Sequence, residues 1–384
     1  MTPAARAQAA IEVLDRIGPE IAAEQALTNW ARGARYAGSG DRAAVRDLVF
    51  DVLRRRRSAA VRGGGEGGRA LLRGSLLLSG EDPDRLFTGE RHAPAPLDER
   101  ERAAGSDPGA EDLMDLPDWL CALFRESLGD AAADVAEALR HRAPVFLRVN
   151  TLRADIATAQ AALNEDGIAT RPHPLSAQAL EVLENPRRIN GSRAFRDGLV
   201  ELQDAASQAV VDALPLRPGQ RVLDYCAGGG GKALAMAART RGQVMAHDSD
   251  PGRMRDLPAR AARAGAEIVP LPNPTGQYDV VLCDVPCSGS GAWRRAPEGK
   301  WTLTPDRLDA LRDVQAAILR RAQGYVAPGG VLAYATCSVL EPENMSQIRI
   351  FCADLPEWRC ASDRQFLPAD GGDGFFVACM TRLR

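Results

Sequence analysis

Lysine is almost absent from this chain of 384 residues: only Lys232 and Lys300 occur, and every other basic side chain apart from histidine is an arginine. Two positions that resist so strong a bias point to a need for a compact ammonium group on a flexible stem. Histidine is scarce as well, with four residues, and no cysteine pair has the CxxC spacing of a metal site. We therefore expect no bound metal.

Long apolar runs are also missing. No stretch approaches the roughly 20 apolar residues of a membrane span, and the opening "MTPAARAQAAIEVLDRI" lacks the apolar core of a signal peptide. We expect a cytoplasmic protein without a membrane segment, and a monomer. Disulfides are not expected in an intracellular chain of this size. Five of the eight cysteines are interpreted as small buried hydrophobic residues, namely Cys121, Cys283, Cys352, Cys360 and Cys379.

The net charge of -3 does not by itself indicate a nucleic-acid-binding protein, but the charges are unevenly distributed. Residues 1–80 hold thirteen Arg and eight Asp or Glu, whereas residues 81–118 hold four Arg and twelve Asp or Glu. A basic N-terminal module is able to follow a phosphate backbone. A solvated helical surface explains the same charges equally well.

The order of predicted elements indicates three domains. Residues 1–140 have the spacing of amphipathic helices, interrupted at about 81–112 by a Pro- and Gly-rich stretch that predicts a loop or flexible linker. Residues 141–204 predict a small α+β subdomain. Residues 205–384 alternate strands and helices, which is typical of a doubly wound, mostly parallel α/β sheet of the Rossmann type.

A glycine-rich loop follows the first strand of that third domain. "RVLDYCAGGGGKALAMAA" reads as strand, loop and helix, with Gly228, Gly230 and Ala233 matching G-x-G-x-x-A. Asp248 ends the next strand, where a carboxylate suits a ribose diol. Together these features predict an adenosine-containing cofactor. Asp224, at the end of the first strand, is placed to face a positively charged cofactor.

Two later strands end beside cysteines, in "YDVVLCDVPCS" and "VLAYATCS". Carbon-5 of cytosine is too electron-poor to attack a methyl donor directly, but addition of a thiolate at carbon-6 makes it nucleophilic. Such a site needs a reactive thiol, an acid near N3 and a base. Asp284, Cys287 and Cys337 supply these groups at neighbouring strand ends.

The motifs "LDYCAGGGGK", "AHDSDPGRM", "DVPCSGSGAWRRAPEGKW", "YATCSVLEPEN" and "GDGFFVACM" resemble, in this order, those of RNA cytosine-C5 methyltransferases of the Sun/RsmB family. "LRVNTLRA" and "ELQDAASQ" are similar to upstream motifs, so the resemblance covers residues 140–384. The N-terminal helices resemble the NusB-type RNA-binding domain of bacterial ribosomal-RNA members. The resemblance implies an S-adenosylmethionine-dependent enzyme that makes 5-methylcytosine in RNA, with small-subunit ribosomal RNA as the expected substrate and rRNA processing as its role.

The resemblance also implies residue roles. Cys337 would be the nucleophile, Cys287 would assist breakdown of the covalent intermediate, and Asp284 would contact both the cytosine and the cofactor. The expected cofactor-binding residues are Asp224, Cys226, Ala227, Gly228, Gly229, Gly230, Gly231, Lys232, Asp248, Arg253, Asn273 and Asp284. The expected RNA contacts are Arg148, Asn150, Arg294, Arg295 and Lys300. Trp293 and Trp301 are able to stack on bases, but aromatic residues in loops more often pack locally, and local packing is the expectation for both.

The chain departs from the family pattern at two places. The loop reads "CAGGGGK" where the family usually has "CAAPGGK", which makes it more flexible, and only Asn273 is available where the family often places an Asp. Two alternatives stay open. A DNA cytosine-C5 methyltransferase would use Cys287 as its nucleophile and would lack the "TCS" motif. A non-catalytic RNA-binding or assembly factor would carry a degenerate cofactor loop.

Overall fold

Two units make up the computed structural model of the chain, in which residues 1–18 and 20–383 are described. The helical unit comprises Met1–Arg142 and a short later segment, Trp293–Leu303. The sheet unit comprises Ala143–Ala292 and Thr304–Arg384. The first unit ends close to residue 140, the boundary expected from the sequence, whereas the inclusion of Trp293–Leu303 was not expected.

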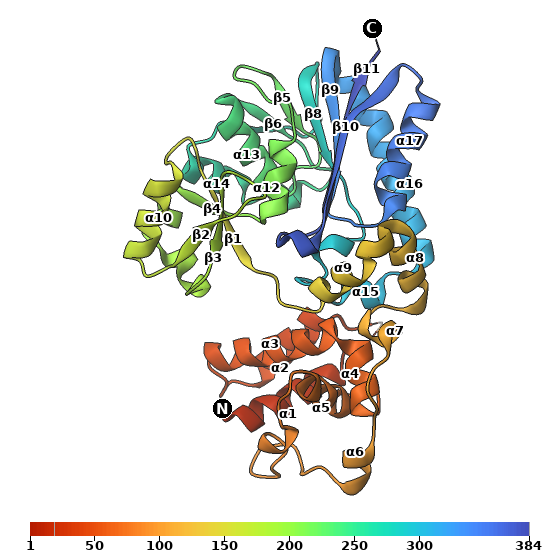
Figure 1. Cartoon of the computed structure of the whole chain (residues 1–384). Coiled ribbons are helices and arrows are strands. Elements are labelled where there is room, and N and C mark those ends of the chain that lie inside the picture. The colour runs from red at the N-terminus through yellow and green to blue at the C-terminus, as the bar shows by residue number, and fades with distance from the viewer. Residues whose placement is uncertain (19, 384) are drawn as a thin grey trace. The chain divides into compact units, whose positions relative to one another are not determined.

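The helical unit is built from short helices around an apolar core that includes Trp30, Val49 and Leu72. Its helices are α1 (Pro3–Leu14), α2 (Ala23–Gly33), α3 (Ser39–Arg54), α4 (Arg56–Gly63), α5 (Gly68–Leu78), α6 (Glu99–Ala103), α7 (Ala110–Leu113), α8 (Asp118–Leu128), α9 (Ala132–Leu139) and α15 (Gly299–Thr302) (Figure 1). Among all helices in the described ranges, none is both long and apolar enough to cross a membrane.

The segment 81–112, which the sequence predicts as a loop or flexible linker, packs against the helical unit. Phe87 and Leu97 are buried in its core, and Glu101 forms an ion pair with Arg69. Further along the acidic stretch, Asp112 pairs with Arg57 at 3.0 Å. Most of the stretch has no helix or strand, as expected of a loop. The flexible-linker alternative is corrected, because apolar side chains and ion pairs attach the stretch to the helices. The acidic stretch also neutralises part of the basic charge of residues 1–80.

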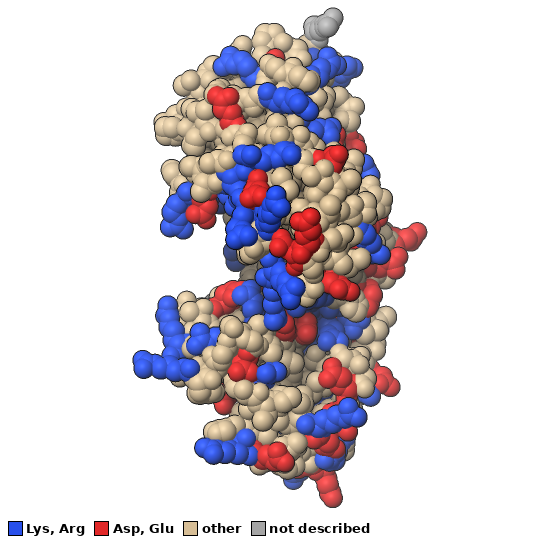
Figure 2. All heavy atoms as spheres, turned by 90° about the vertical axis from the view of Figure 1, so that its left-hand side faces the viewer, with Lys and Arg blue, Asp and Glu red and all other residues tan. Residues whose placement is uncertain are grey.

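The small α+β subdomain opens the sheet unit, as the sequence predicts. Its four strands are β1 (Val145–Val149), β2 (Thr170–Pro172), β3 (Ala179–Val182) and β4 (Val200–Leu202), with helices α10 (Ile156–Glu165) and α11 (Arg193–Arg196). The strands pair antiparallel in the order β2-β3-β1-β4. Leu147, Leu163 and Val200 contribute to its core. Figure 2 faces the side of the molecule on which α10 lies, where Lys and Arg side chains gather with Asp and Glu among them.

The larger sheet has seven strands in the order β10-β11-β9-β8-β5-β6-β7. They are β5 (Val222–Asp224), β6 (Val244–Ala246), β7 (Ile268–Pro270), β8 (Tyr278–Asp284), β9 (Val326–Thr336), β10 (Trp358–Phe366) and β11 (Phe375–Arg382). Five of them, from β9 to β7, are parallel, while β10 and β11 pair antiparallel. This confirms the predicted Rossmann-like α/β class. The strand β10 is not among the predicted strands, because its exposed middle shows no apolar alternation.

Helices cover both faces of this sheet (Figure 1). Helices α12 (Ala205–Asp212) and α13 (Gly231–Thr240) pack on one face, and α16 (Pro305–Ala322) and α17 (Met345–Asp354) pack on the other. Helix α14 (Leu257–Ala264) packs beside α13. The chain runs from β5 to β6 on one side and places β8 on the other. Ligands of such sheets bind at this switch point, beyond the carboxyl ends of the strands.

Candidate active site

A pocket of about 580 Å³ opens at the carboxyl ends of β5, β8 and β9. It is the meeting point of three stretches far apart in sequence: the glycine loop, the end of β8 and the end of β9. The residues that line it are Leu202, Gln203, Ser207, Cys226, Ala227, Gly228, Gly229, Gly231, Lys232, Arg253, Arg260, Asp284, Val285, Pro286, Cys287, Cys337 and Phe375. Most of the residues predicted to hold the cofactor, and all three predicted catalytic residues, are therefore brought together.

The glycine loop takes backbone conformations that favour glycine. Gly228 and Gly230 have φ values of 50° and 78°, a region that other residues rarely adopt. A Cβ atom on Gly230 would come within 2.1 Å of the Leu257 side chain. Gly230 therefore serves the close packing of the loop against α14, and it does not line the pocket.

Asp248, at the end of β6, is tied to the glycine loop. Its carboxylate accepts hydrogen bonds from the Gly228 and Asp250 amides, each at 2.9 Å, and lies 3.5 Å from the Arg253 guanidinium. It also borders a neighbouring pocket of about 470 Å³ that is lined by Asn273, Tyr225 and His247. The two acceptors expected for an adenosine group, Asp248 and Asn273, thus share one pocket.

Asp224 lies behind this pocket wall and is buried. Neither carboxylate oxygen makes a hydrogen bond of ordinary geometry with any described residue. Burial, reinforced by the charge of Asp284, raises the pKa of Asp224 to about 7, while Lys232 acts in the opposite direction. An unpartnered buried carboxylate is uncommon. It fits a site that receives a positively charged group, although Asp224 does not itself line the pocket.

Lys232, the first of the two lysines, forms an ion pair with Asp284. Its Nζ lies 2.6 Å from the carboxylate and 4.8 Å from the centre of the Phe375 ring. Burial lowers the pKa of Lys232, but the charge of Asp284 and their hydrogen bond outweigh this effect, so the pKa is raised. The ammonium group is therefore held at the end of β8, in the wall of the pocket.

Cys287 and Cys337 face each other, with 3.3 Å between their sulfur atoms. They meet because β8 and β9 are parallel neighbours whose carboxyl ends share one sheet edge. The hydrogen bond to Cys337, together with burial, raises the pKa of the Cys287 thiol well above its ordinary value. The contact and the burial therefore favour the protonated form of Cys287.

A buried carboxylate, Glu343, connects the two cysteine loops, and the sequence alone did not single it out. It accepts hydrogen bonds from the amide and hydroxyl of Ser288, from the Ser338 hydroxyl at 2.6 Å and from Gln315 at 3.0 Å. These two serines directly follow Cys287 and Cys337. An acidic residue soon after the "TCS" motif was the available signal, but its partners lie in three separate elements.

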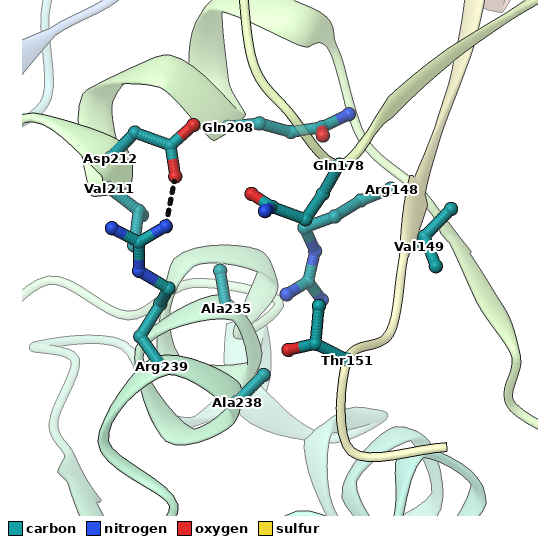
Figure 3. Close-up of a pocket in the computed structure, with 10 residues that line it drawn as sticks. All are labelled: Arg148, Val149, Thr151, Gln178, Gln208, Val211, Asp212, Ala235, Ala238 and Arg239. Carbon is teal, nitrogen blue, oxygen red and sulfur yellow. Dashed lines mark hydrogen bonds and ion pairs between the residues drawn. The ribbon is translucent and has the colours of Figure 1, made fainter. Parts of the chain in front are cut away.

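The residues predicted to contact RNA are mostly interior. Arg148 lies beside a cavity of about 20 Å³ between the small subdomain and α12 and α13 (Figure 3). Burial lowers its pKa to about 10, and its Nε has no hydrogen-bond partner among the described residues. Asn150 donates to the Gly198 and Ala264 carbonyl groups at 2.8 and 2.7 Å. Both side chains serve packing within the sheet unit.

The other three predicted RNA contacts belong to the helical unit. Lys300 is fully buried and donates to the Arg54 carbonyl group at 2.7 Å. Arg294 is also buried, whereas Arg295 is exposed. Trp293 stacks on Phe124 with 5.9 Å between ring centres, which confirms local packing. Arg295 is therefore the exposed residue among the five predicted contacts, and a phosphate group is able to reach it.

Two family profiles match the chain in succession. The profile described as "Methyltr_RsmF/B-like, ferredoxin-like domain" matches residues 116–190, and the one described as "16S rRNA methyltransferase RsmB/F" matches residues 211–381. The second range includes every residue that the pocket draws from the seven-stranded sheet and its loops. Among the described residues, no group of three or more His, Cys, Asp or Glu side chains is arranged to hold a metal ion.

Curated relatives carry the name ribosomal RNA small subunit methyltransferase B. The protein from Vibrio cholerae is 35% identical over 283 residues, which are 69% of this chain and 65% of that protein. The protein from Klebsiella pneumoniae is 34% identical over 70% of this chain and 66% of its own length. The chain thus spans slightly less than two thirds of these relatives.

Solved structures share the fold. The protein PH0851 has a TM-score of 0.76 and 23% identity over 100% of this chain and 99% of its own. A methyltransferase homolog from Pyrococcus horikoshii has a TM-score of 0.64 and 24% identity over 72% of this chain and 100% of its own. NSun6 from the same organism, solved with SFG, has a TM-score of 0.61 and 17% identity over 70% of this chain and 98% of its own.

Proposed function

The chain belongs to the RsmB/F family of methyltransferases, and from this membership we propose that it methylates carbon-5 of a cytidine in RNA, with S-adenosylmethionine as methyl donor. Small-subunit ribosomal RNA is the proposed substrate, since the curated relatives are named for it. The observation that carries the chemistry is the pair of thiols 3.3 Å apart in the pocket.

The pocket residues fit this cofactor, which supplies an electrophilic methyl group when it is bound. Asp248 and Asn273 would hold the adenosine part, and the glycine loop leaves space beside Lys232 and Asp284. Burial raises the pKa of Asp224 to about 7, so a cation bound nearby would stabilise its ionised form, which favours a sulfonium group. A cofactor with a pyrophosphate group would gain nothing from that charge.

Cys337 is the proposed nucleophile. Its thiolate adds to carbon-6 of the cytosine, and carbon-5 takes up the methyl group as S-adenosylhomocysteine is released. Transfer of the carbon-5 proton to water or to a base in the pocket then expels the thiolate and restores the ring. The charge of Cys337 is among the influences that raise the pKa of Lys232. Lys232 and Cys337 therefore lie close enough to interact within the same pocket.

Cys287 and Asp284 have proposed supporting roles. The raised pKa of Cys287 favours its protonated form next to Cys337. Cys287 is therefore able to donate a hydrogen bond to the Cys337 thiolate as that thiolate leaves the cytosine. Asp284 lines the same pocket as the two thiols and Lys232, where it is able to meet the polar edge of a cytosine. Arg295 is the proposed phosphate contact that remains exposed.

The direct test is nucleoside mass spectrometry. The purified chain would be incubated with methyl-labelled S-adenosylmethionine and unmodified small-subunit ribosomal RNA, and labelled 5-methylcytidine is the expected product. Absence of label together with absence of cofactor binding in calorimetry would refute the enzymatic proposal and favour an RNA-binding factor.

Cysteine variants test the assignment of the nucleophile. Cys337→Ala should abolish the covalent protein–RNA adduct on a denaturing gel, because no thiolate adds to carbon-6. Cys287→Ala should let the adduct accumulate, because breakdown of the intermediate is slowed. Cys352→Ala, away from the pocket, is the matched control and should behave as the unmodified chain. The reverse pattern would assign the nucleophile to Cys287, as in the DNA enzymes.

A further inference from the structure

The glycine loop has an unusual requirement for external support. Gly228–Gly231 are four consecutive glycines, and glycine loses more conformational freedom on ordering than any other residue. The Asp248 carboxylate fixes the Gly228 amide at 2.9 Å. The Gly230 amide donates to the Ala227 carbonyl group at 2.8 Å, so the carbonyl side of the same peptide, Gly229, is the part that needs a partner from outside the loop.

Arg260, on helix α14, provides that outside partner. Its Nη1 donates a hydrogen bond to the Gly229 carbonyl group. A Cβ atom on Gly229 would stand 3.1 Å from the same Nη1, so the guanidinium fills the space beside the loop that a side chain would otherwise occupy. Arg260 is also one of the residues that line the pocket.

Glu201 fixes the orientation of this guanidinium. Its carboxylate, on β4 of the small subdomain, accepts from Arg260 Nε and Nη2 at 3.1 and 3.0 Å. The Glu201 side chain is only 5% exposed, so screening by water is weak. The planar arginine fork directs two donors to Glu201 and one to the loop at the same time, which a lysine is unable to do.

We propose that Arg260 is a positioning residue that holds the glycine loop in the conformation that accepts the cofactor, with Glu201 as its support. The inference rests on the proposed function for the identity of the ligand. Glu201 and Arg260 thus connect the small subdomain to the cofactor loop. Arg260 acts on the cofactor through the loop backbone and takes no part in the chemistry.

Arg263 offers a matched control for the test. It donates to the other oxygen of Glu201 from the same helix, and its side chain is 23% exposed against 25% for Arg260. Arg263 does not line the pocket. Loss of either arginine removes one ion pair to Glu201, but only the loss of Arg260 removes the bond to Gly229.

The experiment compares Arg260→Met and Arg263→Met in the full chain. Binding of S-adenosylhomocysteine would be measured by calorimetry, and amide hydrogen exchange of residues 226–231 would be measured without ligand. We expect Arg260→Met to weaken binding by about 10-fold or more, from the lower end of the range of one charge-assisted hydrogen bond upward, and to speed exchange in the loop. Arg263→Met should lower the melting temperature without either change.

The outcomes separate the inference from the proposed function. Equal affinities and equal loop exchange in the two variants would overturn the role of Arg260, while tight binding by the unmodified chain would still uphold the cofactor proposal. If the unmodified chain binds no S-adenosylhomocysteine, the proposed function fails, and loop exchange alone decides whether Arg260 holds the loop. Gly229→Ala, which stiffens the backbone, should recover part of the affinity lost in Arg260→Met.

Discussion

Replacing Lys300 with methionine should change how the stability of the helical unit depends on pH. Lys300 is fully buried, and its Nζ donates to the Arg54 carbonyl group at 2.7 Å. Burial lowers its pKa to about 7 from the ordinary value of 10.5, although the charge of Asp115 acts in the opposite direction. The ammonium form is therefore held in the folded state at a cost that the neutral amine avoids.

The sign and size of the effect follow from this shift. The folded pKa lies below the unfolded one, so between about pH 7 and about pH 10.5 the unfolded chain binds more protons, and stability rises with pH. The full cost of the charged form is roughly 5 kcal/mol. Roughly 2.5 kcal/mol of it disappears between about pH 6 and about pH 9. The unmodified chain should gain this amount relative to Lys300→Met, in which residue 300 has no titratable group.

Tryptophan fluorescence during urea unfolding is the suitable assay. Trp30, Trp119, Trp293 and Trp301 all belong to the helical unit, and Trp358 is the one tryptophan of the sheet unit. The emission therefore reports mainly on the unit that contains Lys300.

Gly33→Ala, in helix α2 of the same unit, is the control for this measurement because it removes no titratable group. Its stability difference from the unmodified chain should stay constant over the same pH range. The reasoning is refuted if the stability difference between the unmodified chain and Lys300→Met stays constant from about pH 6 to about pH 9.

Two further predictions concern packing and positioning. Glu343→Gln should lower the melting temperature, because the new amide group points a donor at groups that now donate to Glu343. It should also reduce kcat by about tenfold or more without changing KM for the cofactor. An equal rise in KM would contradict a role that is confined to positioning the two cysteine loops. Gly74→Ala should destabilise the helical unit by about 1–3 kcal/mol in urea unfolding, since its Cβ would lie 1.9 Å from the Ala59 carbonyl oxygen. Gly33→Ala, where the added Cβ meets nothing within 4 Å, is its control and should be neutral or slightly stabilising.

Local sequence patterns were sufficient for the architecture and for the centre of the site. Strands alternating with helices predicted the parallel sheet, and the loop after β5 was found from its glycines and the strand before it. Cys287 and Cys337 were expected to meet because each follows a strand of a parallel sheet, and the carboxyl ends of such strands share one edge. These features depend on periodicity and chain order, which a sequence displays directly.

The burial of charged and polar side chains was decided by tertiary structure alone. Arg148, Asn150 and Lys300 were expected to contact RNA from the family resemblance, yet each is buried among elements distant in sequence. Glu201 and Arg260 meet 59 residues apart. Such contacts depend on how separate elements pack, and no local pattern encodes that packing. The sequence by itself thus determined which chemistry-bearing residues the sheet would bring to one edge, and only tertiary packing decided which polar groups turn inward to support them.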